Sequence, residues 1–276
     1  MMTDEGVSAR DVPDHFVDHR PGHSAIAELL AAQSELPQRS LLGRIVGQSP
    51  LTTETRLLYQ AAIGEIEVGD ALEALGDGWV VLHCLPVAAG ASDIDHLVIG
   101  PSGVYIVATR NHAKQTVWAS QRTLMVGGIR YPDIRNMEYE MGRVERILSV
   151  AAGFQIEVSA ILAVVSPKSL TVRQKHRDVE ILTAAQLDQW LTLRRRVLAP
   201  EDVMAIAEAA QKSSTWHMDD TPRVDAITMR EGFENLRGEV TGAWRLQLLW
   251  VGTLAVAAAG AFIGVMYEIL AAALGL

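Results

Sequence analysis

Four charged side chains have the types and spacing to form one polar site. Asp93 and Asp95 lie two residues apart in a largely apolar segment, Arg110 follows further along, and Glu65 lies upstream. Carboxylates gathered in this way can bind a divalent cation or transfer protons, and a neighbouring arginine can bind phosphate. Together they would form one polar cluster that could hold a metal ion.

A tight turn between two short strands positions three of these side chains. Strand patterns cover residues 93–99 and 104–109, and a Gly-Pro-Ser-Gly turn at 100–103 joins them. If the last residue of the first strand opposes the first residue of the second, the antiparallel register pairs Asp95 with Ala108. Asp93 then opposes Arg110. The side chains that share one face of the hairpin are those of Asp93, Asp95, Ala108 and Arg110.

Glu65 belongs to a helix pattern that begins at Thr53. Apolar residues at helical spacing, among them Leu58, Val68 and Leu72, form one face of this helix, and Glu65 lies within that face. A carboxylate on the buried side of a helix must be paired, hydrogen-bonded or bound to a metal. The helix could therefore bring Glu65 to the two aspartates.

The order of the remaining elements predicts a mixed sheet with helices on both sides, a three-layer α/β fold. After the helix from Thr53, we expect strands at 79–85, 93–99, 104–109, 158–165 and 179–182, strand-like pieces at 116–119 and 124–126, and helices at 133–152, 184–197 and 200–212.

Composition excludes several classes of protein. The net charge of −9 argues against a surface that binds nucleic acid over its whole extent, although a local basic groove remains allowed. A single cysteine, Cys84, excludes a disulfide framework and a multi-cysteine zinc site. We expect the soluble part to face a reducing compartment.

The C-terminal region contains a candidate membrane span. Residues 246–267 are 22 residues without a charge, about 33 Å as a helix and enough to cross a bilayer core of about 30 Å. Trp244 and Trp250 lie near the start of this run, where interfacial aromatic residues are common, and Arg237 and Arg245 flank only that side. We expect a single-pass membrane protein whose soluble part is cytoplasmic.

Gly260 and Gly264 form a small-xxx-small pair within this span. Such pairs allow two transmembrane helices to approach closely, so one interpretation is a homodimer, and hence a structural membrane assembly module. Ala- and Gly-rich helices also contain this spacing by chance.

The chain therefore divides into four regions. Residues 1–50 are expected to be a disordered acidic and histidine-containing arm, residues 57–197 the α/β domain, residues 198–245 a helix and charged linker, and residues 246–267 the transmembrane helix.

From about Gly64 to Leu191 the sequence resembles the nuclease-related domain (NERD) family, a branch of the PD-(D/E)xK nuclease fold. The resemblance implies a restriction-endonuclease-like fold. Its carriers are Gly64-Glu65, Ile94-Asp95-His96, Gly100-Pro101-Ser102-Gly103-Val104-Tyr105-Ile106-Val107, Asn136, and Val179-Glu180-Ile181-Leu182-Thr183 before Leu187.

Nucleases of this fold hold Mg²⁺ between an Asp on the second strand and a Glu on the third, with a Lys two residues later. The resemblance assigns Asp95 to the Asp and Glu65 to the acid on the first helix. The third strand departs from the pattern, because Ala108 and Arg110 stand where the family has Glu and Lys. Ala108 supplies no ligand, and Arg110 could bind phosphate but could not act as a base.

Two functions follow from this departure. In the first, the site is degenerate, no cofactor is needed, and the domain binds nucleic acid or an unidentified protein partner. In the second, a Mg²⁺-dependent nuclease uses Asp95 and Glu65, with Asp93 as a substitute metal ligand and Arg110 in the role of the lysine. A purely structural alternative is that Asp93 and Arg110 form a cross-strand ion pair.

A basic stretch could bind the substrate. Arg173, Lys175 and Arg177 precede the strand at 179–182 and could contact phosphates. The bland alternative is a solvated face, since the surrounding charge is acidic.

Overall fold

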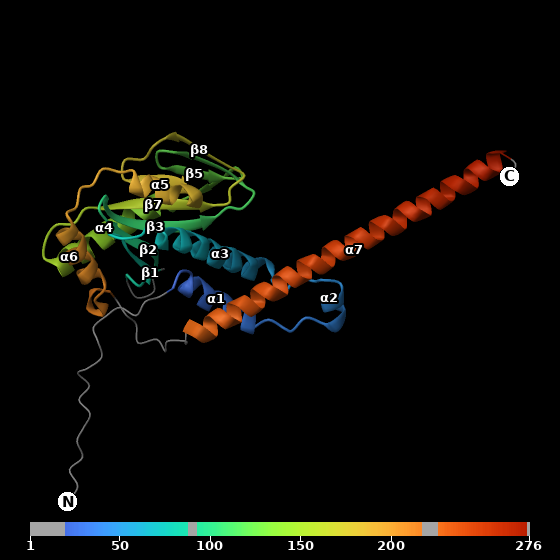
Figure 1. Ribbon diagram of the computed structural model, residues 1–276, viewed down its shortest axis with the longest axis horizontal. Coiled ribbons are helices and arrows are strands. Elements are labelled where there is room, and N and C mark those ends of the chain that lie inside the picture. Colours follow the sequence, from blue (N-terminus) through green and yellow to red (C-terminus); the bar gives the residue numbers. More distant parts are fainter. Residues whose placement is uncertain (1–19, 88–92, 217–225, 275–276) are drawn as a thin grey trace, which may run out of the picture. The chain divides into compact units, whose positions relative to one another are not determined.

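The computed structural model describes residues 20–87, 93–216 and 226–274. It divides into two compact units, which are described separately (Figure 1). The first comprises the described residues up to Ala27 and Leu58–Ala226, and the second comprises Glu28–Leu57 and the C-terminal helix from Ile227. Two helices, α1 (His23–Ser34) and α3 (Thr53–Glu73), contribute residues to both units.

The first unit is built on a five-stranded mixed sheet in the order β1-β2-β3-β7-β9. The β1-β2 and β2-β3 pairs are antiparallel, whereas β3-β7 and β7-β9 are parallel. The strands are β1 (Val80–Leu85), β2 (Ile94–Gly100), β3 (Gly103–Asn111), β7 (Val158–Val165) and β9 (Val179–Thr183).

The hairpin register agrees with the sequence prediction. Ile99 pairs with Val104, and Gly100 with Gly103 at the turn. Trp79 explains the first glycine of the turn, because a Cβ at Gly100 would lie 2.1 Å from its indole ring. The turn therefore depends on a close approach that only glycine permits.

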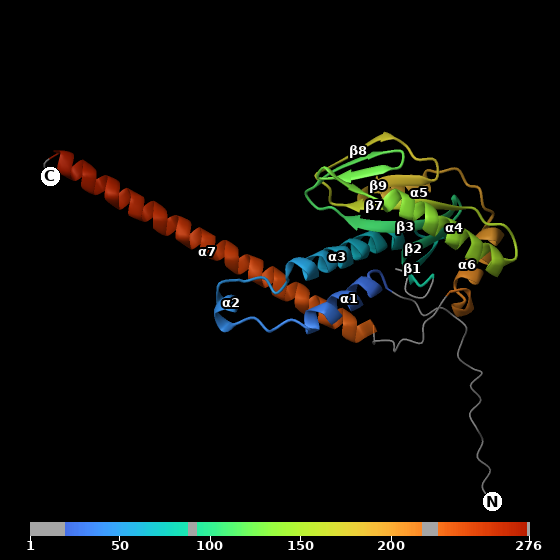
Figure 2. The ribbon, with the colours of Figure 1, turned by 180° about the vertical axis from the view of Figure 1, so that it is seen from behind.

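Helices cover both faces of this sheet, which confirms the expected three layers. Alternate residues of β2 and β3 point to opposite sides. Val98 and Val107 pack with Val68 of α3, while their neighbours on the other face pack with α4 (Asp133–Ala152). Figure 1 shows α3 along one side of the sheet. The opposite view in Figure 2 shows α4. The unit is completed by α5 (Leu187–Thr192) and α6 (Pro200–Ala210).

A second sheet, which the sequence did not predict as a separate unit, lies on the α4 side. Its strand order is β6-β5-β4-β8, with β4 (Thr116–Ser120), β5 (Thr123–Val126), β6 (Ile129–Tyr131) and β8 (Ser169–Gln174). Gly127 and Gly128 both have positive φ and form the tight turn between β5 and β6. The strand β8 escaped prediction because its residues are polar and mostly exposed.

The second unit contains α2 (Leu41–Ile45) and α7 (Ala226–Leu274). Leu29 and Leu51 are buried there with residues of α7. A Cβ at Gly232 would lie 3.2 Å from Leu30, which shows how closely α1 and α7 pack. The N-terminus of α3 is capped reciprocally by Thr52 and Thr55, at the position that the sequence indicated.

Two regions differ from the sequence prediction. Residues 23–34 and 41–45 are helical, whereas the sequence predicted a disordered arm over 1–50; residues 1–19 lie outside the described residues. The expected linker is helical from Ala226. Its apolar residues Met229, Phe233, Leu236 and Ala243 are buried at helical spacing, and the many charges between them concealed this stripe.

The C-terminal helix is long and apolar enough to span a membrane. The candidate span is Ile227–Tyr267, with a mean hydropathy of 2.1, and none of its most apolar window is buried. It contains the predicted residues 246–267 and begins earlier. Gly260 and Gly264 lie in it with open space around both positions.

The contact between Gly100 and Trp79 predicts a stability difference between two glycine substitutions. Gly100→Ala should lower the free energy of unfolding by about 1–3 kcal/mol, because the new methyl group overlaps the indole ring. Gly142→Ala, in α4 with nothing within 4 Å, should raise it by up to about 1 kcal/mol. Urea titration of both variants measures the difference, and equal effects would contradict this account of the turn.

Candidate functional site

The predicted site residues lie where the start of β2 and the end of β3 meet the start of α4. Asp95 lies on β2, and the register places it beside Ala108 of β3, on the face that carries α4. Asp133 is the first residue of α4 and is buried. Arg110, near the end of β3, lies between these two carboxylates.

Asp95 is held by the backbone of the neighbouring strand. The Thr109 N–H donates a hydrogen bond to its Oδ2 at 2.6 Å, and Arg110 Nη1 lies 3.8 Å from the same oxygen. The pKa of Asp95 is nevertheless raised, because burial of its carboxylate, reinforced by the charge of Asp93, outweighs Arg110 and the Thr109 N–H. Asp95 therefore accepts a proton more readily than an ordinary aspartate.

Arg110 pairs most closely with Asp133. Its Nε lies 2.6 Å from Asp133 Oδ1, and its Nη1 donates a hydrogen bond to the Thr109 carbonyl at 2.7 Å. Burial opposes the charge of Arg110, but Asp95 and Asp133 raise its pKa. The cross-strand pair of Arg110 with Asp93 considered from the sequence is wrong, because β2 starts at Ile94 and the guanidinium turns to α4.

One atom of this pair and one atom of a neighbouring histidine have no hydrogen-bond partner within the described part of the chain. They are Asp133 Oδ2 and His112 Nε2, and both are buried. Burial lowers the pKa of His112. The charge of Asp133 opposes this shift, and the charge of Arg110 adds to it. Glu140, two turns into α4, has a raised pKa through burial and the charge of Asp95. The α4 side of the site thus adds two acids to Asp95.

Asp93 and Glu65 lie with a different set of neighbours. Ser24 Oγ donates a hydrogen bond to Asp93 at 2.5 Å. Glu65 lies on α3, which packs on the opposite face of the sheet from Asp95, yet both carboxylates are close enough to Cys84 to raise its pKa. The predicted single cluster is therefore spread over both faces, with Asp93 and Cys84 at the strand edge between them.

Cys84 interrupts the regular pairing of β1 with β2. Its φ of +54° is left-handed, and the residues on either side, His83 and Leu85, pair with His96 and Ile94. Burial of the thiol, with the charges of Glu65 and Asp95 adding to the effect, raises the pKa of Cys84 to about 12. The group is a neutral thiol at physiological pH and neither a nucleophile nor a metal-binding thiolate.

His96, which follows Asp95 on β2, is a core residue. Its Nδ1 lies 2.8 Å from His83 Nδ1, and its Nε2 lies 3.3 Å from Thr109 Oγ1. Burial, with the adjacent His83, lowers the pKa of His96 well below its usual value. A Cβ at Gly69 of α3 would lie 3.5 Å from this ring, so the pair is enclosed by the helix.

The basic stretch lies apart from Asp95. Lys175 pairs with Glu180 at 2.8 Å, and Arg177 with the adjacent Asp178 at 3.5 Å. Between them, His176 lies 3.1 Å from Glu138 of α4. Glu138 contacts the basic stretch, whereas Glu140 interacts with Asp95. Residues two apart on a helix face different ways, so the basic stretch and Asp95 lie on different sides of α4. Arg173 is exposed at the end of β8.

One comparison with known proteins supports the resemblance found in the sequence. Residues 60–165 match the family model described as nuclease-related domain (NERD). This segment is a nuclease-related domain. It begins within α3 and ends with β7, so it includes Glu65, both aspartates, Arg110 and Asp133. The resemblance at β9 and α5 lies beyond the match, and neither the curated proteins nor the solved structures searched gave a match.

The side chains of the nuclease-related domain do not fit a divalent cation well in this arrangement. Asp95 Oδ2 already accepts from Thr109, Asp93 is bound by Ser24, and Ala108 supplies no oxygen between them. No group of three or more His, Cys, Asp or Glu side chains within residues 20–87, 93–216 and 226–274 is placed to hold a metal ion. Mg²⁺ prefers near-octahedral oxygen ligands, and the cationic Arg110 lies beside the carboxylate that would bind it.

Sequence reasoning missed the partner of Arg110. Asp133 was treated only as the first residue of a helix, where an acidic side chain is favoured by the helix dipole. Ser24 was also missed, since it lies in the segment interpreted as an arm. The structure also places Glu140 close enough to Asp95 for their charges to interact.

The raised pKa of Asp95 predicts a pH-dependent difference from an amide variant. A carboxyl whose pKa is raised on folding stabilises the protein below its unfolded value of 3.8, and this contribution is lost as the pH rises through the folded pKa. The unmodified protein therefore loses this contribution as the pH rises, and Asp95→Asn does not. The free energy of unfolding of the variant minus that of the unmodified protein should increase from pH 4 to neutral pH. Urea titrations across this range measure it. Asp188→Asn, at an exposed site on α5, is the control that should show little change.

Proposed function

We propose that this protein is a membrane-anchored nuclease-related domain that binds a partner and does not hydrolyse phosphodiesters. The observation that carries the proposal is the state of Arg110. The residue in the position of the family's lysine forms an ion pair with Asp133 at 2.6 Å. A guanidinium held in this way cannot take up a proton from water, and its charge is already compensated.

The loss of the third-strand carboxylate supports the same proposal. Ala108 lies beside Asp95 and is buried. The strand β3 has no acidic side chain that could replace the missing carboxylate. Metal-assisted hydrolysis depends on a cation that polarises the phosphate and lowers the pKa of bound water. Without the carboxylate between the strands, the domain has no suitable set of ligands for that cation.

The charge around the site favours a cationic protein segment over nucleic acid as the partner. The carboxylates of Asp95, Asp133 and Glu140 all act on Arg110, and Arg143 is the other arginine that acts on Glu140. This local excess of negative charge disfavours a phosphate backbone. Nucleic acid could instead contact the basic stretch at Arg173, Lys175 and Arg177. That surface is weakened for this purpose because Lys175 and Arg177 each have an acidic partner.

A Mg²⁺-dependent nuclease is the second candidate, and one observation favours it. Asp93 lies close enough to Asp95 to raise its pKa, and Glu65 and Asp95 both act on Cys84, so three carboxylates approach the edge of β2. In this alternative Asp93 replaces the missing ligand, and Arg110 binds the scissile phosphate. It requires Asp93 to leave Ser24 and Arg110 to leave Asp133.

The proposed orientation places the domain in the cytoplasm. Arg237 and Arg245 both lie on α7 before its longest uncharged run, which has no arginine or lysine after it within the sequence. Positively charged flanking residues favour the cytoplasmic side of a membrane helix. Close contact between two copies through Gly260 and Gly264 would be a separate property of the span.

A cleavage assay with a restored site tests the proposal. The full-length protein should not cleave single-stranded DNA, double-stranded DNA or RNA in Mg²⁺ or Mn²⁺. The double variant Ala108→Glu, Arg110→Lys should cleave at a rate at least about a hundredfold above this background, the scale of a single acid–base or electrostatic contribution. Adding Asp95→Ala to the double variant should abolish that activity.

Matched variants distinguish loss of chemistry from loss of structure. Ala108→Gln with Arg110→Lys has the same size without the carboxylate and should stay inactive. Circular dichroism would show whether each variant folds. Cleavage by the unmodified protein that Asp95→Ala abolishes would overturn the proposal in favour of the Mg²⁺-dependent nuclease.

A further inference from the structure

The second unit exposes a cluster of large apolar side chains on a very short helix. Leu41 is 78% exposed, Leu42 74%, Ile45 56% and Val46 54%. They belong to α2 and the residue after it, in a helix of five residues capped by Ser40. Four adjacent apolar side chains at this exposure mark an interaction surface and not the scattered apolar residues of a normal surface.

The segment that carries these side chains is fixed to α7. Gly47 has a φ of +78°, and a Cβ there would lie 2.5 Å from the Ala243 carbonyl oxygen, so the two backbones touch. Trp250 Nε1 donates a hydrogen bond to the Ile45 carbonyl at 2.9 Å. These contacts hold the α2 loop, defined as residues 39–48, against α7 between Ala243 and Trp250.

This attachment point is the start of the uncharged run of α7. The run begins at Leu246, and Trp244 and Trp250 are 59% and 47% exposed on either side of that position. Tryptophan is enriched where a membrane helix enters the headgroup layer. The exposed side chains of the α2 loop are therefore attached to the part of α7 that would lie at the surface of the bilayer.

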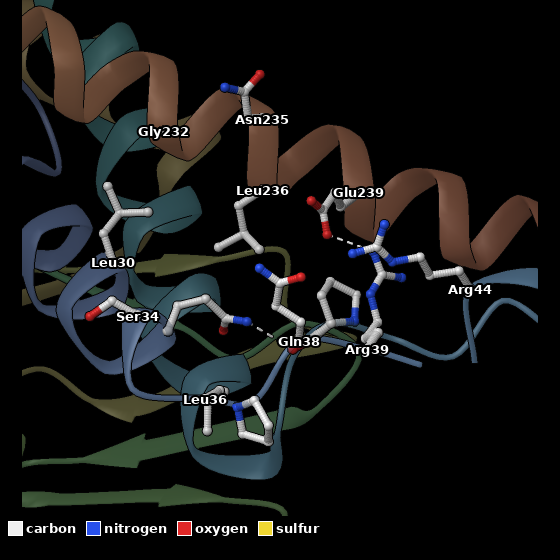
Figure 3. A pocket seen from close by; sticks show the side chains of 13 residues that line it. Leu30, Ser34, Leu36, Gln38, Arg39, Arg44, Gly232, Asn235, Leu236 and Glu239 are labelled. Atoms are coloured by element: carbon white, nitrogen blue, oxygen red, sulfur yellow. Dashed lines mark hydrogen bonds and ion pairs between the residues drawn. The ribbon is translucent and has the colours of Figure 1, made fainter. Parts of the chain in front are cut away.

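Basic side chains accompany the apolar ones. Arg39 forms an ion pair with Glu239 at 2.5 Å and donates to the Gln48 carbonyl at 2.9 Å, while Arg44 on α2 is exposed. Figure 3 shows Arg39 and Arg44 on the same side of α7 as Glu239, beside a pocket of about 380 Å³. Arginine beside exposed leucine is the composition of segments that lie in the interface of an anionic membrane.

We propose that the α2 loop is a second membrane contact, in which Leu41, Leu42, Ile45 and Val46 enter the interfacial layer of the bilayer that α7 spans. Arg44 then lies at the level of the lipid phosphates. The occupant of this surface is an anionic lipid leaflet, because the cluster is continuous with the exposed apolar surface of α7. The inference rests on membrane insertion of α7 and does not depend on nuclease chemistry.

Fluorescence quenching by lipids tests this contact in the full-length protein. A polarity-sensitive dye attached through Leu42→Cys would be measured in phosphatidylcholine–phosphatidylglycerol vesicles whose acyl chains are brominated. The same dye at Ala257→Cys, in α7, reports insertion of the span. Leu193→Cys is the matched control, since Leu193 is 76% exposed in the first unit. The native Cys84 is buried, and the unsubstituted protein measures its background labelling.

The expected result is a blue-shifted emission and a loss of fluorescence at position 42 comparable to that at 257, with little loss at 193. Quenching at 257 with position 42 behaving like 193 would overturn the α2 contact and leave the membrane anchor intact. Absence of quenching at 257 would overturn both. Disulfide cross-linking of Leu42→Cys between two copies without lipid quenching would identify a dimer surface and also overturn the inference.

Discussion

The ion pair of Arg110 with Asp133 connects the last residues of β3 to the first residue of α4, and the geometry of the polar site depends on it. Asp133 is 8% exposed as a side chain and Arg110 38%, so the pair lies at the edge of the core. Removing one partner would leave the other charge partly buried without compensation, which is far less favourable than removing both. A substitution in β3 can therefore be understood only together with the carboxylate on α4.

The same pair explains how the domain can keep a nuclease-like architecture around a different set of charges. The parallel strands β3 and β7 and the helices on both faces are held by apolar packing, to which Ala108 contributes and Arg110 does not. The charge of Arg110 is compensated by Asp133, with Asp95 as a second acidic neighbour. Such a site can be conserved in shape without any requirement for catalysis, and function must be argued from the side chains and not from the fold.

The parts predictable from the sequence were those set by periodicity and turn chemistry. The strands at 80–85, 94–100 and 158–165 are mostly apolar, and the Gly-Pro-Ser-Gly turn fixed the pairing of Ile99 with Val104. The positions of Asp95 and Arg110 on the hairpin followed from that register.

What could not be predicted depended on contacts between distant segments. Ser24 and Asp133 reach the site from α1 and α4, and neither has a local pattern that indicates its partner. The first turns of α7 were interpreted as a linker because charged residues separate its buried side chains. Glu65 was placed on the correct helix, but the helix lies on the other face of the sheet from Asp95. Both carboxylates raise the pKa of Cys84.

The enclosed thiol of Cys84 has a consequence for redox chemistry. With a pKa of about 12, only about one molecule in a hundred thousand carries the thiolate at pH 7. Peroxides and glutathione disulfide react with thiolates, so oxidation to a sulfenic acid or glutathionylation at this position would be very slow. The only cysteine, which lies beside the polar site, is therefore poorly suited to a thiol-based redox signal.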